Sequence, residues 1–207
     1  MPSIPQAILE RCRSLAEGVV LAPKEFLHLG SRYAVDQAFS RLAKAGHLIR
    51  IGRGLYVSPV QTNNQTRAPS LERVAESLAA QGKQRIAVNG ARAAKSLGLT
   101  QNSPREGVFL TTGRSRQLQI GDATVALQHA PYWMLALGSS RAGDAIRALA
   151  WMGRDHVDAA TSALYQRLPR DEWDTLASVR ASLPSWMAVS IGKAATRNEL
   201  GRSNAGS

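Results

Sequence analysis

The feature that most constrains this chain is an amphipathic segment, residues 31–46, followed directly by a glycine-containing hairpin pattern. Ser31 is a good helix N-cap and Gly46 a good helix end. Between them, apolar residues recur at helical spacing, at Val35, Ala38, Phe39, Leu42 and Ala45. The segment therefore predicts a surface helix with one buried face and one polar, basic face.

Two β-prone runs follow this helix, residues 47–51 and 55–58, on either side of Gly52-Arg53-Gly54. This pattern predicts a β-hairpin, with Arg50 and Arg53 on or beside its tip.

The residues before the amphipathic segment fit the same plan. Their apolar spacing predicts a helix from Pro5 to about Leu15, a strand at residues 19–21 and a short helix at residues 23–29. The order is then helix, short helix, tight turn, amphipathic helix and hairpin. That is the plan of a winged helix-turn-helix, in which the third helix enters the major groove and the hairpin lies near phosphates or the minor groove. We expect this domain to span residues 1–60.

The exposed face of the amphipathic helix and the hairpin supply the candidate contacts to double-stranded DNA. On the helix, they come from the polar side chains Arg32, Tyr33, Asp36, Gln37, Ser40, Arg41 and Lys44. Arginine and lysine bind phosphate or guanine, and glutamine reads adenine edges. The alternative is a module of the same shape that contacts protein, because the polar face of a surface helix is often only solvated.

The rest of the chain predicts a mixed domain. Residues 61–68 are polar and typical of a linker. Strands are expected at residues 85–88, 108–111, 117–120 and 124–128, and helices at residues 70–81, 91–97, 142–152, 157–168, 173–183 and 186–195. The expected fold class is α+β: a winged helix-turn-helix, then residues 69–195 with a small antiparallel sheet and C-terminal helices, then a flexible tail at 196–207.

Charge favours a polyanionic partner for most of the chain. The net charge is +11, and residues 1–60 hold 8 Lys/Arg against 4 Asp/Glu, residues 61–150 hold 11 against 5, and residues 151–207 hold 7 against 6. The C-terminal part is nearly neutral and needs another kind of partner. The middle of the sequence also contains a basic patch. Either this patch extends the surface that binds nucleic acid, or it is only a solvated positive face. It comprises Arg92, Lys95, Arg105, Arg114 and Arg116.

Cys12 is the single cysteine, which excludes an intramolecular disulfide and a cysteine-rich zinc site. Its place in an apolar-periodic segment predicts a small buried side chain. The sequence has no apolar run of membrane-spanning length and no signal-peptide pattern. We therefore expect a cytoplasmic protein with no membrane partner.

Enzymatic chemistry is not expected. None of the four histidines, His28, His47, His129 and His156, has a partner at metal-ligand spacing. Residues 138–144 have some likeness to the Gly-Ser…Asp-x-Asp signature of nucleotidyltransferases. However, Ile146 stands where the second metal-binding carboxylate is required. We expect no catalytic residues, no metal site and no cofactor.

Several runs of residues resemble the AbiEi-type antitoxins of type IV toxin–antitoxin (abortive infection) systems. In the N-terminal part they are Leu21-Ala22-Pro23-Lys24-Glu25-Phe26-Leu27, Gly30-Ser31-Arg32, residues 35–42, Gly46 and Arg53-Gly54-Leu55-Tyr56-Val57. In the middle they are Asn89-Gly90-Ala91-Arg92, Leu97-Gly98-Leu99, Thr111-Thr112-Gly113-Arg114 and Ala148-Leu149-Ala150-Trp151-Met152-Gly153. The resemblance covers roughly residues 5–180.

The resemblance implies two roles. The winged helix would bind inverted repeats in its own promoter and repress the operon, and the C-terminal domain would counteract a nucleotidyltransferase-like toxin. It leaves open whether antitoxin and toxin form a stable complex. The positions that match the family's winged-helix motif are Ser31, Arg32, Tyr33, Gln37, Arg41, Arg50 and Arg53. No motif defines an antitoxin surface, so none of its residues is assigned.

An alternative function is a protein-interaction module with a structural winged helix, whose C-terminal helices bind a partner enzyme. The salt dependence of binding distinguishes a DNA-binding protein from a protein-interaction module. The affinity for DNA falls steeply as the salt concentration rises, whereas the affinity of an apolar protein interface does not. A ribonucleotide-modifying enzyme would need a carboxylate cluster that we do not find in the sequence.

Overall fold

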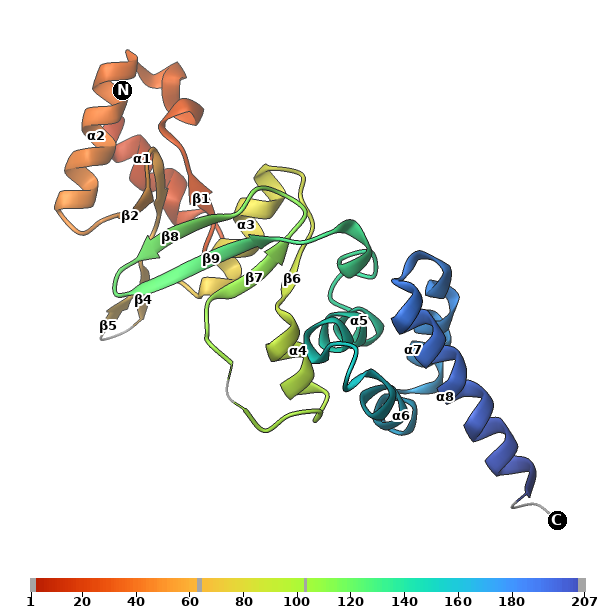
Figure 1. The fold of residues 1–207 in the computed structure, drawn as a ribbon. Helices are drawn as coiled ribbons and strands as arrows, with labels where there is room; N and C mark the ends of the chain where they lie inside the picture. Colours follow the sequence, from red (N-terminus) through yellow and green to blue (C-terminus); the bar gives the residue numbers. More distant parts are fainter. Residues whose placement is uncertain (1–2, 63–64, 103, 205–207) are drawn as a thin grey trace. The chain divides into compact units, whose positions relative to one another are not determined.

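The computed structural model describes residues 3–62, 65–102 and 104–204, and the chain divides into two compact units (Figure 1). Unit 1 comprises Met1–Gln84 and Gly113–Gln128, and unit 2 comprises Arg85–Thr112 and His129–Ser207. Both units combine helices with short antiparallel strands, so the α+β prediction is confirmed.

The elements of unit 1 follow the predicted order from α1 to β3, and further elements come after them. They are α1 (Ile4–Arg13), β1 (Val20–Leu21), the 3-10 helix η1 (Pro23–Leu29), α2 (Arg32–Lys44), β2 (Ile49–Gly52), β3 (Leu55–Val57), β4 (Val60–Thr62), β5 (Gln65–Arg67), α3 (Leu71–Gln81), β8 (Arg116–Ile120) and β9 (Ala123–His129). The path from α1 to β3 is compatible with the predicted winged helix-turn-helix.

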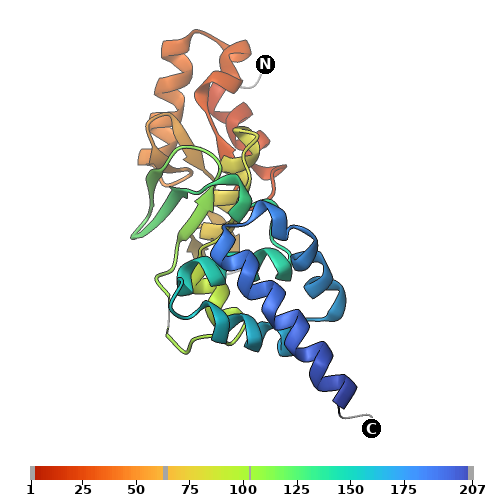
Figure 2. The same cartoon turned by 45° about the vertical axis from the view of Figure 1, so that its right-hand side comes forward.

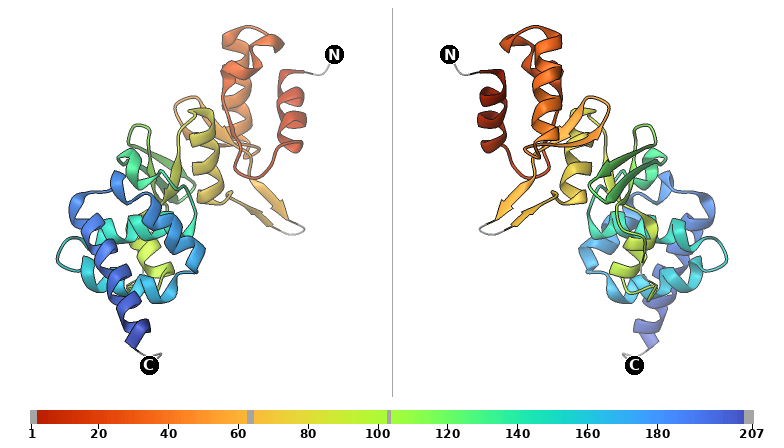
Figure 3. Two further views of the ribbon diagram at one scale, coloured as in Figure 1. Left: turned by 90° about the vertical axis from the view of Figure 1, so that its right-hand side faces the viewer. Right: turned by 90° about the vertical axis from the view of Figure 1, so that its left-hand side faces the viewer.

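An aromatic cluster joins the helices of unit 1 to its sheet. Phe39 of α2 is fully buried and packs edge-on against Phe26 of η1, with ring centroids 5.3 Å apart. On the sheet side, its ring lies 4.9 Å from that of Tyr56 in β3. Ile8 of α1 belongs to the same buried cluster, and α1 and α2 lie side by side (Figure 3). This packing fixes which face of α2 points outward.

The first sheet has the strand order β1-β3-β2, and all its pairs are antiparallel. Tyr56 pairs with Leu21 on one side and with Arg50 on the other. The register shifts between Arg50 and Gly52, which is a bulge next to the hairpin turn. A bulge raises the local twist and re-aims side chains at the tip.

Helix α3 closes the free edge of β1. The backbone N–H of Val20 donates to Ser77 Oγ at 2.9 Å, and Gln81 Nε2 donates to the Val20 carbonyl at 2.6 Å. These bonds satisfy backbone groups that an edge strand leaves unpaired. Glu17 adds an ion pair with Arg67, 2.9 Å between Oε1 and Nη1.

The β8–β9 hairpin contacts the same sheet at β2, the edge strand opposite β1. Gly52 of β2 approaches Leu118 of β8 so closely that a Cβ on Gly52 would lie 3.0 Å from Leu118 Cδ2. Unit 1 therefore extends beyond the expected boundary at residue 60 and takes in a segment from the middle of the chain.

The segment expected as a linker contains the β4–β5 hairpin, which projects from the body of unit 1 (Figure 3). Its described residues pair antiparallel, with Gln61 opposite Thr66 and Thr62 opposite Gln65. Both strands are largely exposed, so they lack the apolar alternation that predicts a half-buried strand.

Unit 2 is mostly helical. Its elements are β6 (Ile86–Val88), α4 (Gly90–Ser96), β7 (Val108–Thr111), the 3-10 helix η2 (Tyr132–Met134), α5 (Arg141–Met152), α6 (Val157–Arg167), α7 (Arg170–Ser178), the 3-10 helix η3 (Arg180–Ser182) and α8 (Ser185–Asn204). Strands β6 and β7 pair antiparallel, with Ala87 opposite Leu110.

Small residues let α4 and α5 pack closely. A Cβ on Gly90 would collide with the carbonyl of Arg147 and lie 2.5 Å from Trp151 Cβ. The helices of unit 2 share one apolar core that includes Ala94, Leu149 and Leu164.

Helix α8 lies across the other helices of unit 2 (Figure 2) and contacts α6, where Ser190 donates to Thr161 Oγ1 at 3.1 Å. It continues to Asn204, so most of the segment expected as a flexible tail is helical. The last three residues of that tail, 205–207, lie outside the described residues.

Candidate nucleic-acid interface

Ser31 sets the start of α2. Its Oγ accepts a hydrogen bond from the backbone N–H of Ala34 at 3.2 Å, which satisfies one of the free N–H groups at the helix N-terminus. Val35, Phe39 and Leu42 are buried in the unit 1 core. Because these contacts fix the rotation of the helix, its opposite half faces solvent.

The exposed half of α2 carries the side chains that the spacing predicts there. Arg32, Tyr33, Asp36, Gln37, Arg41 and Lys44 are exposed, and Ser40 is partly exposed. Tyr33 is 75 % exposed, which leaves its ring and hydroxyl open to a partner.

The charges on this half of α2 are not all free. Arg32 Nε donates to Asp36 Oδ2 at 3.0 Å, one turn further along the helix. Arg41 and Lys44 form no ion pair with any residue that the structure describes. Their donors are therefore available to phosphate oxygens or guanine edges. The pairing of Arg32 with Asp36 is a detail that we did not anticipate from sequence.

The β2–β3 hairpin places two more cations on the surface of unit 1. Arg53 is exposed at the turn, where Gly54 has φ +67°, the left-handed conformation that glycine adopts readily. Arg50 is exposed on β2, and its Nε donates to the Gly52 carbonyl at 3.3 Å. This bond folds the Arg50 side chain along the strand toward the turn.

The expected basic patch in the middle of the sequence is divided between the two units. Arg114 and Arg116 belong to unit 1, whereas Arg92, Lys95 and Arg105 belong to unit 2. Arg116 is partly buried, and its Nη2 donates to the Leu78 carbonyl at 3.4 Å. Arg114 is exposed.

Asp144, the last residue of the segment that is similar to the nucleotidyltransferase signature, forms an ion pair with Arg147. The Arg147 side chain is fully buried, and its Nη1 also donates to the carbonyls of Met134 (3.1 Å) and Gly138 (2.8 Å). Burial lowers the pKa of Arg147 from its ordinary value, and the ion pair with Asp144 opposes that shift. Asp144 thus has a structural partner in the core of unit 2.

The described histidines also take part in local contacts. His28 stacks on Phe26 with ring centroids 6.4 Å apart, and His156 Nδ1 lies 3.3 Å from the Met152 carbonyl oxygen. Across residues 3–62, 65–102 and 104–204, no three His, Cys, Asp or Glu side chains gather in a way that could hold a metal ion.

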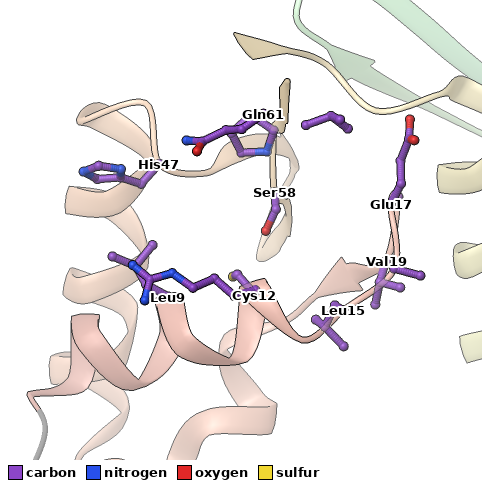
Figure 4. Close-up of a pocket in the computed structure, with 13 residues that line it drawn as sticks. Leu9, Cys12, Leu15, Glu17, Val19, His47, Ser58 and Gln61 are labelled. Atoms are coloured by element: carbon purple, nitrogen blue, oxygen red, sulfur yellow. The ribbon is translucent and has the colours of Figure 1, made fainter. Parts of the chain in front are cut away.

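A cavity of about 550 Å³ opens beside α1 in unit 1 (Figure 4). Cys12 lines it and is only partly buried, whereas the apolar spacing of its segment predicts a small buried side chain. Ser58 lies across from Cys12, and its buried Oγ points toward the Cys12 side chain. Sequence gives no sign of this cavity, because its lining comes from segments far apart in the chain.

The comparison with protein families identifies the group to which the chain is related. A family model described as a family of unknown function (DUF6088) matches residues 7–175. The chain belongs to this family. The match includes all of the candidate interface and most of unit 2. No curated protein and no solved structure matches the chain.

No helix within the described part of the chain is both long enough and apolar enough to span a bilayer.

Proposed function

We propose that this DUF6088 protein is a transcriptional regulator that binds double-stranded DNA through α2 and the β2–β3 hairpin. The observation that carries the proposal is the exposed half of α2. There Arg41, Lys44 and Gln37 project from a helix whose other half is fixed in an aromatic core. A rigid helix with projecting donors suits the major groove.

The side chains divide by the contact that each can make. Arg41 and Arg32 bind phosphate or guanine, and Gln37 reads a base edge. Arg53 on the hairpin turn binds a phosphate or enters the minor groove. The remaining contacts come from Ser31, Tyr33, Lys44 and Arg50.

We further propose that the chain represses its own operon in the cytoplasm and serves as a type IV antitoxin. The support for this part is the resemblance to AbiEi-type antitoxins, which extends from the winged-helix motif into unit 2. In this scheme unit 1 binds inverted repeats in its own promoter. Unit 2, which holds the nearly neutral C-terminal part of the chain, counteracts a nucleotidyltransferase-like toxin.

Two readouts in the same cells test the combined proposal. A reporter gene placed behind the chain's own upstream DNA measures repression, and growth during expression of a nucleotidyltransferase-like toxin encoded beside it measures protection. Wild type should repress the reporter and restore growth. A variant with Arg41→Ala and Arg53→Ala should lose repression and keep protection. If wild type neither represses nor protects, the proposal is wrong.

Exposed aromatic side chains favour a second candidate, a protein-interaction module. In unit 2, Trp151 of α5 is 46 % exposed and Tyr132 of η2 is 61 % exposed. Aromatic residues are enriched where proteins bind one another. A partner protein held by such a surface would stay bound at salt concentrations that release DNA.

A further inference from the structure

We propose that the cavity beside α1 binds a small amphipathic molecule that carries a carboxylate. The cavity shares no residue with the candidate nucleic-acid interface, and this inference does not depend on DNA binding.

The cavity has the size and construction of a small-molecule site. Its volume of about 550 Å³ falls within the range of roughly 300–1,000 Å³ that is common for ligand pockets. Its walls come from α1, from residues 15–19, from His47, and from residues 58–61 after β3. All of these belong to unit 1, so the cavity forms within one compact body.

The inner wall of the cavity is apolar. Leu9, Cys12 and Leu15 line it while packing against the buried cluster of unit 1. Burial raises the pKa of the Cys12 thiol, so this side chain stays neutral and adds to the apolar wall. A ligand with an aromatic or aliphatic body would cover this wall.

Two polar atoms of the lining face each other. In Figure 4, the Ser58 hydroxyl points toward Cys12. Ser58 Oγ is buried, and its interaction with the Cys12 thiol opposes the rise in the Cys12 pKa that burial causes. The preference of the cavity for an anion therefore comes from its charged end and not from Ser58.

The charges around the cavity favour an anion at one end. Leu9 and His47 lie at the same end, and Glu17 lies at the other (Figure 4). Arg13 is one helical turn beyond Leu9 on the same face of α1 and lines the cavity. It forms no ion pair with a described residue, whereas Glu17 is already bound by Arg67. A carboxylate beside Arg13 and His47 would gain a charge-assisted hydrogen bond.

Ligand binding in the cavity can be followed at Cys12, because Cys12 is the single thiol in the chain. The rate at which iodoacetamide alkylates Cys12 is followed by mass spectrometry, with 2-naphthoate or its neutral counterpart 2-naphthamide present. We expect 2-naphthoate to protect Cys12 at concentrations about tenfold lower than 2-naphthamide, the effect of one charge-assisted hydrogen bond. Equal protection by the two compounds, or no protection by 2-naphthoate, would overturn the proposal.

A pair of arginine variants locates the anion. Arg13→Gln should abolish the preference for 2-naphthoate, and Arg11→Gln, on the same helix but outside the cavity lining, should keep it. Loss of the preference in both variants would contradict an anion site at Arg13. Thermal melting of each variant checks folding, and the comparison of the two naphthalene compounds on wild type decides the question if Arg13→Gln does not fold.

Discussion

Arg32 Nε donates a hydrogen bond to Asp36 Oδ2 at 3.0 Å within the exposed half of α2. Both side chains are about half exposed or more, so the pair contributes little to stability. If α2 binds DNA as proposed, this pair matters more for binding than for stability. Asp36 holds the side chain of Arg32, and it would place a negative charge beside the DNA phosphates.

Replacing Asp36 with asparagine should therefore strengthen DNA binding. The change frees Arg32 for a phosphate, and one added phosphate contact should steepen the log–log salt dependence of binding by about 0.9. The gain in affinity should be similar for the operator and for random DNA, because phosphate contacts carry no sequence information. Affinity and salt slope are measured by fluorescence anisotropy. Glu76→Gln is the matched control, since Glu76 forms a similar exposed pair with Arg73 on α3. Weaker binding by Asp36→Asn would contradict this account.

Arg41 is the residue of α2 from which we expect the largest loss. If Arg41 reads a base, Arg41→Ala should weaken binding to the chain's operator by about 1–3 kcal/mol and relax specificity at one position. Arg154→Ala removes the same charge from an exposed turn of unit 2 and should leave the affinity unchanged. Equal operator affinities for wild type and Arg41→Ala would rule out this role.

The helices and most strands follow from local patterns in the sequence. Val35, Phe39 and Leu42 recur at helical spacing, and burying them in one core leaves a single rotation for α2. Ser31 caps the helix as its type predicts. The exposed positions of the candidate interface follow from the same spacing, which is why they were predicted residue by residue.

Contacts between distant segments could not be predicted in this way. The packing of Leu118 on Gly52 and the bonds from Val20 to α3 depend on tertiary structure, so the composition of unit 1 was not visible in the sequence. The β4–β5 hairpin has polar residues on both faces, which is why it resembles a linker. The burial of Arg147 also runs against the usual exposure of arginine.

Glu17 should make the stability of unit 1 depend on pH. Hydrogen bonds from Arg67 and from the backbone N–H of Ser70 lower the pKa of Glu17 below its ordinary value of 4.5. A carboxylate whose pKa is lowered on folding stabilises the folded state above the unfolded pKa. That contribution disappears as the pH falls through the folded pKa.

The expected result is a pH-dependent difference between wild type and Glu17→Gln. Wild type should be more stable near neutral pH, and the difference should shrink as the pH falls below 4.5 and then vanish. Urea unfolding at a series of pH values measures it. A difference that persists unchanged into acid would show that Glu17 does not act through its charge.

Asp144 should contribute strongly to the stability of unit 2. Its removal leaves the guanidinium of Arg147 buried without a counter-charge, which costs about 3–5 kcal/mol. Asp144→Ala should therefore lower the melting temperature strongly, and Asp155→Ala, at an exposed turn, should not. If Asp144→Ala melts like wild type, the pair with Arg147 is not the structural contact described above.

The most direct test of the central claim is a gel-shift titration of the purified protein with the DNA upstream of its own gene. Random DNA serves as competitor, at two salt concentrations. We expect a specific shift that survives competition and weakens at the higher salt, because cations on α2 and the β2–β3 hairpin would release counterions from the phosphates. Absence of a shift, or equal binding to random DNA, would contradict the claim that α2 reads an operator.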